Sequence, residues 1–433
     1  MSLELTNSQY KLEDLCLQIT DGKHGDCENQ ENSGYYFVSV KDIDEGEIDY
    51  SNARQITKYD FEDTDKRTKL ENEDILITNS GTIGKFVFVN SPLSRKTTFQ
   101  KSVAIIKPDK NKILPKFLYY YLISEKRRLI EYAGGTTQKN LLLRDIRNFE
   151  VEIPNEIKQK KIINILNDID QLIKVKKTLN KNLNKQIKLL YKSFFIDFDY
   201  YNGLFKESIF GEIPSDWDLI AFKEILSERN EKSTNQKIPM YSVTLDGIQP
   251  RSLIYNKKIT SKTTKFKIVH KYDLIFGMPN SGYQFGIMYD NIGGVSSAYP
   301  VFEINNIHPR YVELFIQSIS NYFNDIVKSG SRMGQGIDKN VLLNKEIYIP
   351  PEKYLDNYYS IESNLLNMIH NNSIEIKKLS KLRDTLLPKL MSGEIDVSKI
   401  NCDLIIHNYY LSARFSTIFL HLSVNLFLID CNV

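Results

Sequence analysis

The stretch EIKQKKIINILNDIDQLIKVKKTLNKNLNKQIKLLYKSFF, residues 156–195, decides the fold of this chain. It contains neither proline nor glycine, Pro154 precedes it, and Asn155 stands where a helix N-cap belongs. Its apolar residues recur at a 4-3-4 spacing, which predicts a coiled-coil helix roughly 60 Å long that needs a partner to cover its apolar stripe. The expected helix-packing residues are Ile162, Leu166, Ile169, Ile173, Leu183, Ile187 and Leu190. The same register puts Lys176 and Asn180 on the seam.

Length and composition are those of an ordinary globular protein. The 433 residues are 41% hydrophobic and 26% charged, and the formal net charge is only +3. The chain as a whole does not have the charge of a nucleic-acid binder, so any basic surface must be local. The cysteines Cys16, Cys27, Cys402 and Cys431 form no CxxC pair, so neither a zinc site nor a disulfide framework is expected. Because the N-terminus also lacks the form of a signal peptide, we expect a reduced, cytoplasmic protein.

Residues 10–155 predict a mixed α/β domain. Short strands are expected at residues 35–40, 74–78, 85–89 and 102–106. A helix is expected after Pro115, followed by the polar loop GGTTQKN and by a strand that ends at Pro154. The helical pattern of the long stretch fails around DFDYYNGLF, residues 197–205, which indicates a boundary there.

Residues 206–351 predict a second domain of the same kind, because three segments recur in the same order at a period of roughly 195 to 200 residues. NEDILITNSGTIGKF (72–86) resembles KYDLIFGMPNSGYQFG (271–286). ILPKFLYYYLIS (113–124) resembles IHPRYVELFIQS (307–318). GGTTQKNLLLRDIRNFEVEIP (134–154) resembles SGSRMGQGIDKNVLLNKEIYIP (329–350).

The repeat extends into a second helix, expected at residues 352–391, with a similar apolar seam and a polar middle at Asn372 and Glu375. Its expected packing residues are Ile361, Leu365, Met368, Leu379, Leu382 and Leu386. An antiparallel pairing would bring the polar middles of the two helices together, and such a polar layer fixes a register. The expected fold class is therefore α/β (mixed α+β), with two similar domains separated by two long antiparallel helices that form a coiled coil. The expected parts are a first domain (1–155), a first spacer helix (156–205), a second domain (206–351), a second spacer helix (352–395) and a tail (396–433).

The tail is apolar and lies outside the repeat. Its most apolar run, FSTIFLHLSVNLFLI, has 15 residues, which is short of the about 17–25 that a membrane-spanning helix needs. A docked or disordered tail is therefore favoured over a membrane anchor.

Sequence motifs for catalysis are missing. GTIGKF (81–86) lacks the spacing of a phosphate-binding loop, and Phe86 stands where a serine or threonine would coordinate magnesium. The six histidines include no HExxH, and no GxSxG or glycine-rich methyltransferase loop is present. We therefore expect no catalytic residue and no metal ligand in this chain.

Each domain instead presents loops of the type that read base edges, mixing cationic, amide and hydroxyl side chains with glycines that let the backbone approach closely. In the first domain the candidate DNA-binding residues are Lys23, His24, Ser80, Thr82, Lys85, Thr136, Thr137, Gln138 and Lys139. In the second they are Asn280, Ser281, Tyr283, Gln284, Ser297, Tyr299, Ser331, Arg332, Gln335 and Lys339. A polar loop alone is ordinary surface; the recurrence of these loops at equivalent positions of the repeat supports the functional interpretation.

The first long helix is rich in lysine, with ten lysines against three acidic residues between 156 and 196. A solvated face explains such a helix as well as a polyanion or an acidic partner lying alongside it does.

At this point the chain resembles the specificity subunit of a type I restriction-modification enzyme. LRDTLLPKLMSGEI (382–395) resembles the helix ending of that family, and KLLYKSFF (188–195) is its weaker counterpart in the first helix. EIPNEIKQKKIINIL (152–166) is similar to the family's central region, and NSGTIGK also fits the family's pattern. The resemblance covers roughly residues 10–398; the tail from about Asn401 departs from it.

The resemblance implies a subunit that catalyses nothing and binds no cofactor. Its two target recognition domains would each read one half of an asymmetric, bipartite site in double-stranded DNA. The helices would set the gap between the half-sites, and the subunit would recruit two modification subunits and the restriction subunits. S-adenosylmethionine, ATP and magnesium would belong to those partners, and no membrane is involved.

Two other interpretations stay open. One is a protein–protein scaffold, with two adaptor domains on a coiled-coil spacer and no contact with DNA. The other is the recognition part of a single-chain restriction-methyltransferase.

Overall fold

The computed structural model describes residues 8–44, 46–134, 140–234, 237–245, 247–254, 265–277, 283–328 and 336–397. The chain divides into two compact units. Unit 1 comprises Met1–Lys177 and Asn372–Val433, and unit 2 comprises Thr178–Asn371.

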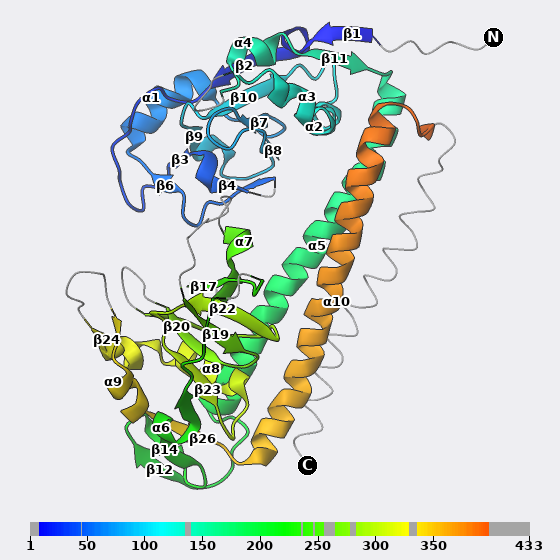
Figure 1. The fold of residues 1–433 in the computed structure, drawn as a ribbon. Coiled ribbons are helices and arrows are strands. Elements are labelled where there is room, and N and C mark those ends of the chain that lie inside the picture. The colour runs from blue at the N-terminus through cyan, green and yellow to red at the C-terminus, as the bar shows by residue number, and fades with distance from the viewer. Residues whose placement is uncertain are drawn as a thin grey trace. The chain divides into compact units, whose positions relative to one another are not determined.

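Unit 1 is built on a four-stranded antiparallel sheet with the order β2-β10-β7-β8 (Figure 1). Its strands are β2 (Cys16–Asp21), β10 (Val103–Pro108), β7 (Ile75–Thr78) and β8 (Phe86–Phe88). Alternate side chains of β7 enter different clusters, because successive residues of a strand point to opposite faces. Ile75 and Ile77 pack with Phe117 of α2 (Pro115–Ser124), whereas Leu76 packs with Val38 and Phe99.

The other strands of unit 1 form smaller sheets. The strand β1 (Ser8–Lys11) pairs with β11 (Glu150–Ile153), β4 (Ile43–Asp44) pairs with β5 (Glu47–Ile48), and β3 (Tyr36–Val38) lies between β6 (Arg54–Gln55) and β9 (Thr97–Phe99). The remaining short helices of unit 1 are α1 (Lys58–Thr68), α3 (Lys126–Glu131), α4 (Leu143–Arg147) and the 3-10 turns η1 (Leu12–Leu15), η2 (Val40–Asp42) and η3 (Ser94–Lys96).

Unit 2 repeats this plan with the sheet order β15-β23-β20-β21 (Figure 1). These strands are β15 (Leu226–Glu228), β23 (Val301–Ile304), β20 (Leu274–Gly277) and β21 (Gln284–Ile287). The paired strands are β14 (Asp218–Ala221) with β26 (Glu346–Ile349), β12 (Phe205–Ser208) with β13 (Gly211–Pro214), β17 (Tyr241–Thr244) with β18 (Gly247–Pro250), and β24 (Val327–Lys328) with β25 (Gly336–Ile337). A three-stranded sheet has the order β16 (Lys232–Ser233), β19 (Phe266–His270) and β22 (Ile292–Ser296). The short helices are α6 (Phe222–Ile225), α7 (Arg251–Ile254), α8 (Pro309–Ser318), α9 (Lys339–Asn344) and the 3-10 helix η4 (Ser320–Ile326).

The internal repeat is visible in the fold of the two units. Each four-stranded sheet joins its strands in the same order along the chain, and both α2 and α8 begin with proline at the first helical turn. The units differ in their additional sheets: β3 and β9 run parallel, whereas β16, β19 and β22 are all antiparallel.

The two long helices are confirmed at the expected residues, as α5 (Glu156–Phe195) and α10 (Glu352–Met391), each of 40 residues. The Asn155 side chain accepts a hydrogen bond from the backbone N–H of Lys158 at 2.9 Å, so Asn155 is the N-cap. Each helix contributes one half to unit 1 and the other half to unit 2.

Within unit 1, the first half of α5 packs antiparallel to the last half of α10. Early residues of α5, such as Ile162, share a cluster with late residues of α10, such as Leu390. Asp170 lies 3.2 Å from Arg383 and also accepts a hydrogen bond from the Tyr120 hydroxyl of α2 at 2.7 Å. Further along, Lys176 forms an ion pair with Glu375, as the expected meeting of the polar middles requires.

Within unit 2, the remaining halves of the two helices pack in the same antiparallel sense. The end of α5, at Phe194 and Phe195, shares its cluster with Tyr358 near the start of α10. Nearer the middle, the side-chain amide of Asn180 donates to the Ile369 carbonyl at 3.4 Å. The end of α5 thus lies against the start of α10, which is the antiparallel arrangement expected.

The expected helix-packing residues are buried or half-buried, with one exception. Ile162, Leu166, Ile169, Ile173, Leu183 and Ile187 are buried; Leu190, Ile361, Leu365, Met368, Leu379 and Leu386 are half-buried. The prediction that Leu382 packs between the helices was wrong, because Leu382 is 47% exposed. The seam steps by four residues from Leu379 to Arg383 and then by three to Leu386, and the bond to Asp170 stabilises Arg383 there.

The segment after α10 returns to the start of α5. Gly393 adopts a left-handed φ of 77°, which ends the helix, and Val397 is buried in the same cluster as Ile162. The Lys161 ammonium donates to the Val397 carbonyl at 3.2 Å. The expected tail lies outside the described residues from position 398 onward.

Candidate nucleic-acid interface

The loop DGKHG is tied to residues 99–101 of unit 1. The Lys23 backbone N–H donates to the Phe99 carbonyl at 2.8 Å, and the Lys23 carbonyl accepts from the Lys101 N–H at 3.1 Å. A Cβ added at Gly22 would overlap the backbone of Phe99 and Gln100. Only glycine therefore allows this close approach of the two segments.

Two more of the loops identified in the sequence join the same region. In NSGTIGK, the Asn79 N–H donates to the Ser102 carbonyl at 3.0 Å. The end of the loop GGTTQKN is held against it, because the Leu141 N–H donates to the Asn79 carbonyl at 2.9 Å and Asn140 pairs with Ser80. Three loops far apart in sequence thus converge around residues 99–103.

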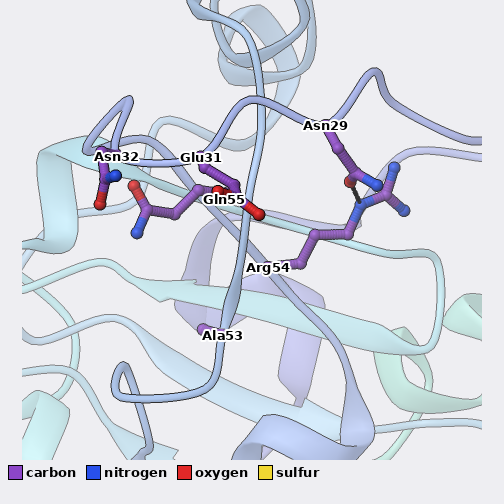
Figure 2. Close-up of a pocket in the computed structure, with 6 residues that line it drawn as sticks. All are labelled: Asn29, Glu31, Asn32, Ala53, Arg54 and Gln55. Carbon is purple, nitrogen blue, oxygen red and sulfur yellow. Dashed lines mark hydrogen bonds between the residues drawn. The ribbon is translucent and has the colours of Figure 1, made fainter.

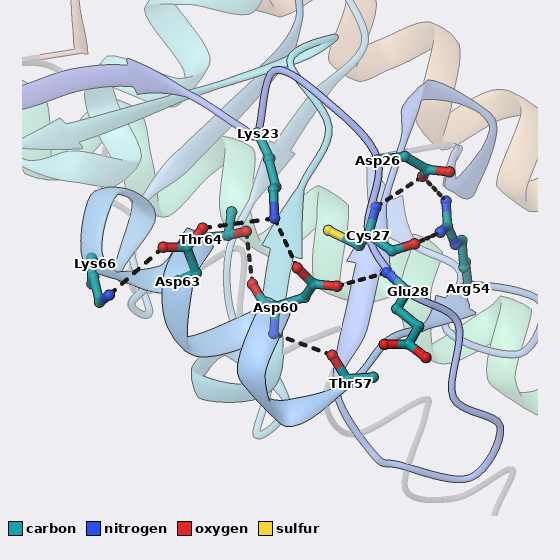
Figure 3. A network of polar contacts seen from close by, with 10 residues as sticks. All are labelled: Lys23, Asp26, Cys27, Glu28, Arg54, Thr57, Asp60, Asp63, Thr64 and Lys66. Carbon is teal, nitrogen blue, oxygen red and sulfur yellow. Dashed lines mark hydrogen bonds and ion pairs between the residues drawn. The ribbon is translucent and has the colours of Figure 1, made fainter.

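The Lys23 side chain of the first loop has partners inside unit 1 (Figure 3). The Lys23 ammonium lies 2.9 Å from Asp60 and 3.7 Å from Asp63. The hydrogen bond with Asp60 raises the pKa of Lys23 and lowers the pKa of Asp60. His24 is exposed, with its Nε2 3.0 Å from the Asp21 carboxylate. The charge of Lys23 is therefore compensated within its own unit.

The second loop offers hydroxyl groups rather than a free cation. Lys85 donates to the Ile43 carbonyl at 2.5 Å and lies 3.6 Å from Asp44. Ser80 is half-buried, whereas Thr82 is exposed. Of the three candidates in this loop, Thr82 is the most accessible to a ligand.

Lys101, which the sequence analysis did not select, carries an exposed cation at the centre of the converging loops. Its side chain makes no ion pair with any residue that the structure describes. Gln100, beside it, is half-buried. Both lie in the short connection between β9 and β10, and a polar pair between two apolar strands is the signal that could have identified them.

Unit 1 also has an open pocket of about 360 Å³ that the sequence analysis missed (Figure 2). We call it the amide pocket; its lining residues are Asn29, Glu31, Asn32, Ala53, Arg54 and Gln55. Two segments form it, and the pairing of Asn29 with Ile56 brings them together. A local sequence pattern does not reveal such a non-local pairing.

In unit 2, two predicted DNA-binding residues support the fold. The Tyr283 hydroxyl donates to the Ser320 carbonyl at 2.8 Å, and burial raises the pKa of Tyr283 to about 12. Lys339 forms an ion pair with Glu228. Gln284 is half-buried on β21.

The loop after β22 is more open. Ser297 is exposed, whereas Tyr299 is half-buried and packs against the cluster that contains Val243. The Tyr299 carbonyl accepts from the Lys267 ammonium at 2.9 Å. Only Ser297 of this pair is freely accessible.

Nine predicted residues lie outside the described part of the chain, and their roles stay predictions. They are Thr136, Thr137, Gln138, Lys139, Asn280, Ser281, Ser331, Arg332 and Gln335.

Several lysines of α5 are paired, which reduces the basic character of the helix. Lys174 lies 2.8 Å from Glu47, and Lys160 lies 2.6 Å from Glu156. By contrast, three exposed lysines of one face make no ion pair within the described ranges; they are Lys181, Lys185 and Lys188.

The described residues contain no group of three or more histidine, cysteine, aspartate or glutamate side chains placed to hold a metal ion. Among the helices that the structure describes, none is long and apolar enough to cross a bilayer.

Comparison with known proteins finds similarity to type I restriction-modification proteins. Residues 7–185 match the family described as "Type I restriction modification DNA specificity domain". The chain is 27% identical over 354 residues to the MjaIX specificity subunit of Methanocaldococcus jannaschii, a match covering 75% of this chain and 78% of the relative. It is 23% identical over 389 residues to the HindI specificity subunit of Haemophilus influenzae, a match covering 72% of this chain and 84% of the relative. The S subunit structure from M. genitalium aligns over 90% of this chain and 97% of that chain, with 14% identity and a TM-score of 0.46.

Residues 7–185 therefore match a type I restriction-modification DNA specificity domain, and the relatives aligned over about three quarters of the chain are named as type I specificity subunits, as the helix-end and central motifs indicated. The matched family is described as a DNA specificity domain and the relatives as specificity subunits, which agrees with the expectation that this chain is not itself an enzyme.

Proposed function

We propose that this chain reads an asymmetric, bipartite site in double-stranded DNA, with residues 1–155 recognising one half and residues 206–351 the other. One observation carries the proposal: the two units share a sheet order but carry different residues in equivalent loops. NSGTIGK follows β7, for example, whereas MPNSGYQ follows β20. Because loop side chains specify bases, similar domains with different loops should read different half-sites.

The helices α5 and α10, within residues 156–205 and 352–395, act in this proposal as the spacer between the half-sites. A helix of 40 residues is roughly 60 Å long, while duplex DNA repeats about every 34 Å. Such a spacer can hold two domains over grooves one to two turns apart. The polar contact of Lys176 with Glu375 supports a fixed register, and hence a fixed gap.

The proposed partners are two modification subunits and the restriction subunits of one cytoplasmic complex. The modification subunits would methylate adenine with S-adenosylmethionine, and the restriction subunits would use ATP and magnesium. This chain would bind DNA and its partners but none of these cofactors.

Mapping adenine methylation in the genome, with and without this gene, tests the proposal. We expect deletion to remove methylation from one non-palindromic, two-part motif, and reintroduction of the gene to restore it. A methylome that is the same in both strains, while the modification subunits are expressed, would contradict the proposal.

A binding experiment separates DNA recognition from a scaffold role. The complex purified with its modification subunits should bind duplex DNA that carries the mapped motif, with an affinity that falls steeply as salt rises. A scaffold without DNA contact would purify with the same partners but would not require the motif.

A further inference from the structure

The amide pocket of unit 1 has a hydrogen-bonding pattern that suits one kind of DNA base. The inference rests on the proposed function, because the ligand is taken to be duplex DNA. None of the lining residues belongs to the loops singled out in the sequence, so the pocket adds a contact that those loops do not supply.

Arg54 is the one cation among the lining residues that the structure describes, and its hydrogen bonds already have partners within unit 1. Arg54 donates through Nε to the side-chain oxygen of Asn29, through Nη1 to Asp26 at 2.5 Å, and through Nη2 to the Cys27 carbonyl. Its guanidinium also lies 5.5 Å from the ring centre of Phe37. Arg54 is thus a fixed part of the wall, with few donors left for a phosphate group or for guanine.

The remaining side chains keep hydrogen-bonding capacity that faces solvent. The Gln55 side-chain oxygen accepts from the Gly34 N–H at 2.8 Å, which leaves its NH₂ group as a donor. The Asn29 side-chain oxygen accepts from Arg54, so the NH₂ group of Asn29 likewise remains available as a donor. Glu31 and Asn32 make no side-chain hydrogen bond within the described part of the chain. The pocket therefore combines free amide donors with one free carboxylate acceptor.

Backbone pairing holds these groups in place before any ligand arrives. The Gln30 N–H donates to the Gln55 carbonyl at 3.1 Å, and the Thr57 N–H donates to the Glu28 carbonyl at 3.1 Å. Asn32 has a left-handed φ of 57°, a conformation that asparagine tolerates better than most residues and that is typical of a tight turn. In Figure 2 the Gln55 side chain points toward Asn32, whereas Arg54 points toward Asn29.

We propose that the amide pocket reads an adenine through its major-groove edge, in the half-site recognised by unit 1. That edge presents the N7 acceptor and the N6 amino donor side by side. The free amide of Gln55 supplies a donor for N7, and the Glu31 carboxylate accepts from N6. Guanine presents two acceptors there and would face Glu31 unfavourably, and a phosphate group would be repelled by the same carboxylate.

Competition binding with the purified complex tests the assignment. The probes are duplexes that carry the mapped site with each base pair of both half-sites replaced in turn. We expect Glu31→Ala, and separately Gln55→Leu, to reduce the preference for adenine at one position of one half-site by roughly ten- to a hundred-fold. Because Glu31 is exposed and makes no side-chain bond among the described residues, its replacement should leave the fold intact.

Gln30→Ala is the matched control, since Gln30 is an exposed amide next to the pocket that does not line it. It should keep the wild-type ranking of all probes. An unchanged ranking in both pocket variants, or equal weakening for every probe, would overturn the assignment. If the wild-type complex itself binds all duplexes alike, the proposed function fails instead, independently of the pocket.

Discussion

Replacing Glu362 tests how the long helix α10 is attached to unit 2. Glu362 is 2% exposed, and its carboxylate lies 3.0 Å from Nε of Arg310 on α8. Arg310 also bonds Glu313 at 2.6 Å, and the Tyr289 hydroxyl donates to Glu313 at 2.6 Å. This buried network therefore connects α10 with the helix that covers the sheet of unit 2.

Removing one partner of a buried ion pair typically costs about 3–5 kcal/mol, because the other charge stays buried. Since Arg310 keeps Glu313, we expect Glu362→Ala to destabilise unit 2 by about 3 kcal/mol. For a unit of this size, that corresponds to a fall of roughly 6 to 12 °C in Tm. Glu362→Gln, which keeps the length of the side chain and an oxygen that accepts from Arg310, should lose less stability than Glu362→Ala, because the Arg310 donor keeps an acceptor.

The fluorescence of Trp217 measures the stability of unit 2 directly. It is the only tryptophan of the chain and lies fully buried in unit 2, so its signal on heating reports the unfolding of that unit. Asp356→Ala, which removes an exposed carboxylate of the same helix, should change the stability by no more than about 0.5 kcal/mol. If Glu362→Ala and Asp356→Ala gave the same transition, Glu362 would not form the buried contact that the structure places there.

Two further predictions concern pH and charge. The His308 side chain accepts a hydrogen bond from the Arg310 N–H at the start of α8, and burial lowers the pKa of His308. Unit 2 should therefore lose stability as pH falls through the unfolded-state pKa of about 6.5. His308→Asn keeps an acceptor and should remove this dependence from thermal melts followed by Trp217 fluorescence between pH 8 and 5, whereas an identical pH profile in the variant would contradict the assignment. Lys101→Ala should weaken binding to all DNA sequences and reduce the slope of log affinity against log salt concentration by about one. Lys23→Ala should leave this slope nearly unchanged, because Asp60 already compensates the charge of Lys23. Gel shifts across a salt series measure both slopes, and a larger change in the Lys23 variant would refute the assignment.

The long helices could be predicted from the sequence because their signal is local. A 4-3 spacing without proline or glycine predicted the helix that the structure has at Glu156–Phe195, and the failure of the pattern around residues 197–205 indicated its end only approximately. The packing residues of α10 were harder to predict. A heptad pattern does not show whether the next residue on the seam after Leu379 is Leu382 or Arg383. The tertiary bond to Asp170 decides for Arg383, and no local pattern contains it.

The candidate interface could be predicted only in outline. The sequence indicated which loops carry polar side chains, but it indicated neither that three of them converge in unit 1 nor which of their side chains are paired with distant partners. The sequence does not show that α1 places Asp60 beside Lys23. It also does not show that Asp44 lies beside Lys85. The amide pocket stayed hidden because backbone pairing joins Asn29 to the strand that carries Gln55.

We propose that the paired helices set the distance between the two half-sites. Inserting one heptad into α5 after Lys177, and another into α10 before Asn372, lengthens both helices where they pass from one unit to the other. Seven residues add roughly 10 Å of helix, which is about three base pairs of DNA. Inserting into α5 alone should instead put the helices out of register and abolish methylation.

Methylome mapping of the double-insertion strain is the most direct measurement. We expect both half-sites to keep their sequences while the gap between them grows by about three base pairs. An unchanged gap with active methylation, or a change of sequence within either half-site, would contradict it.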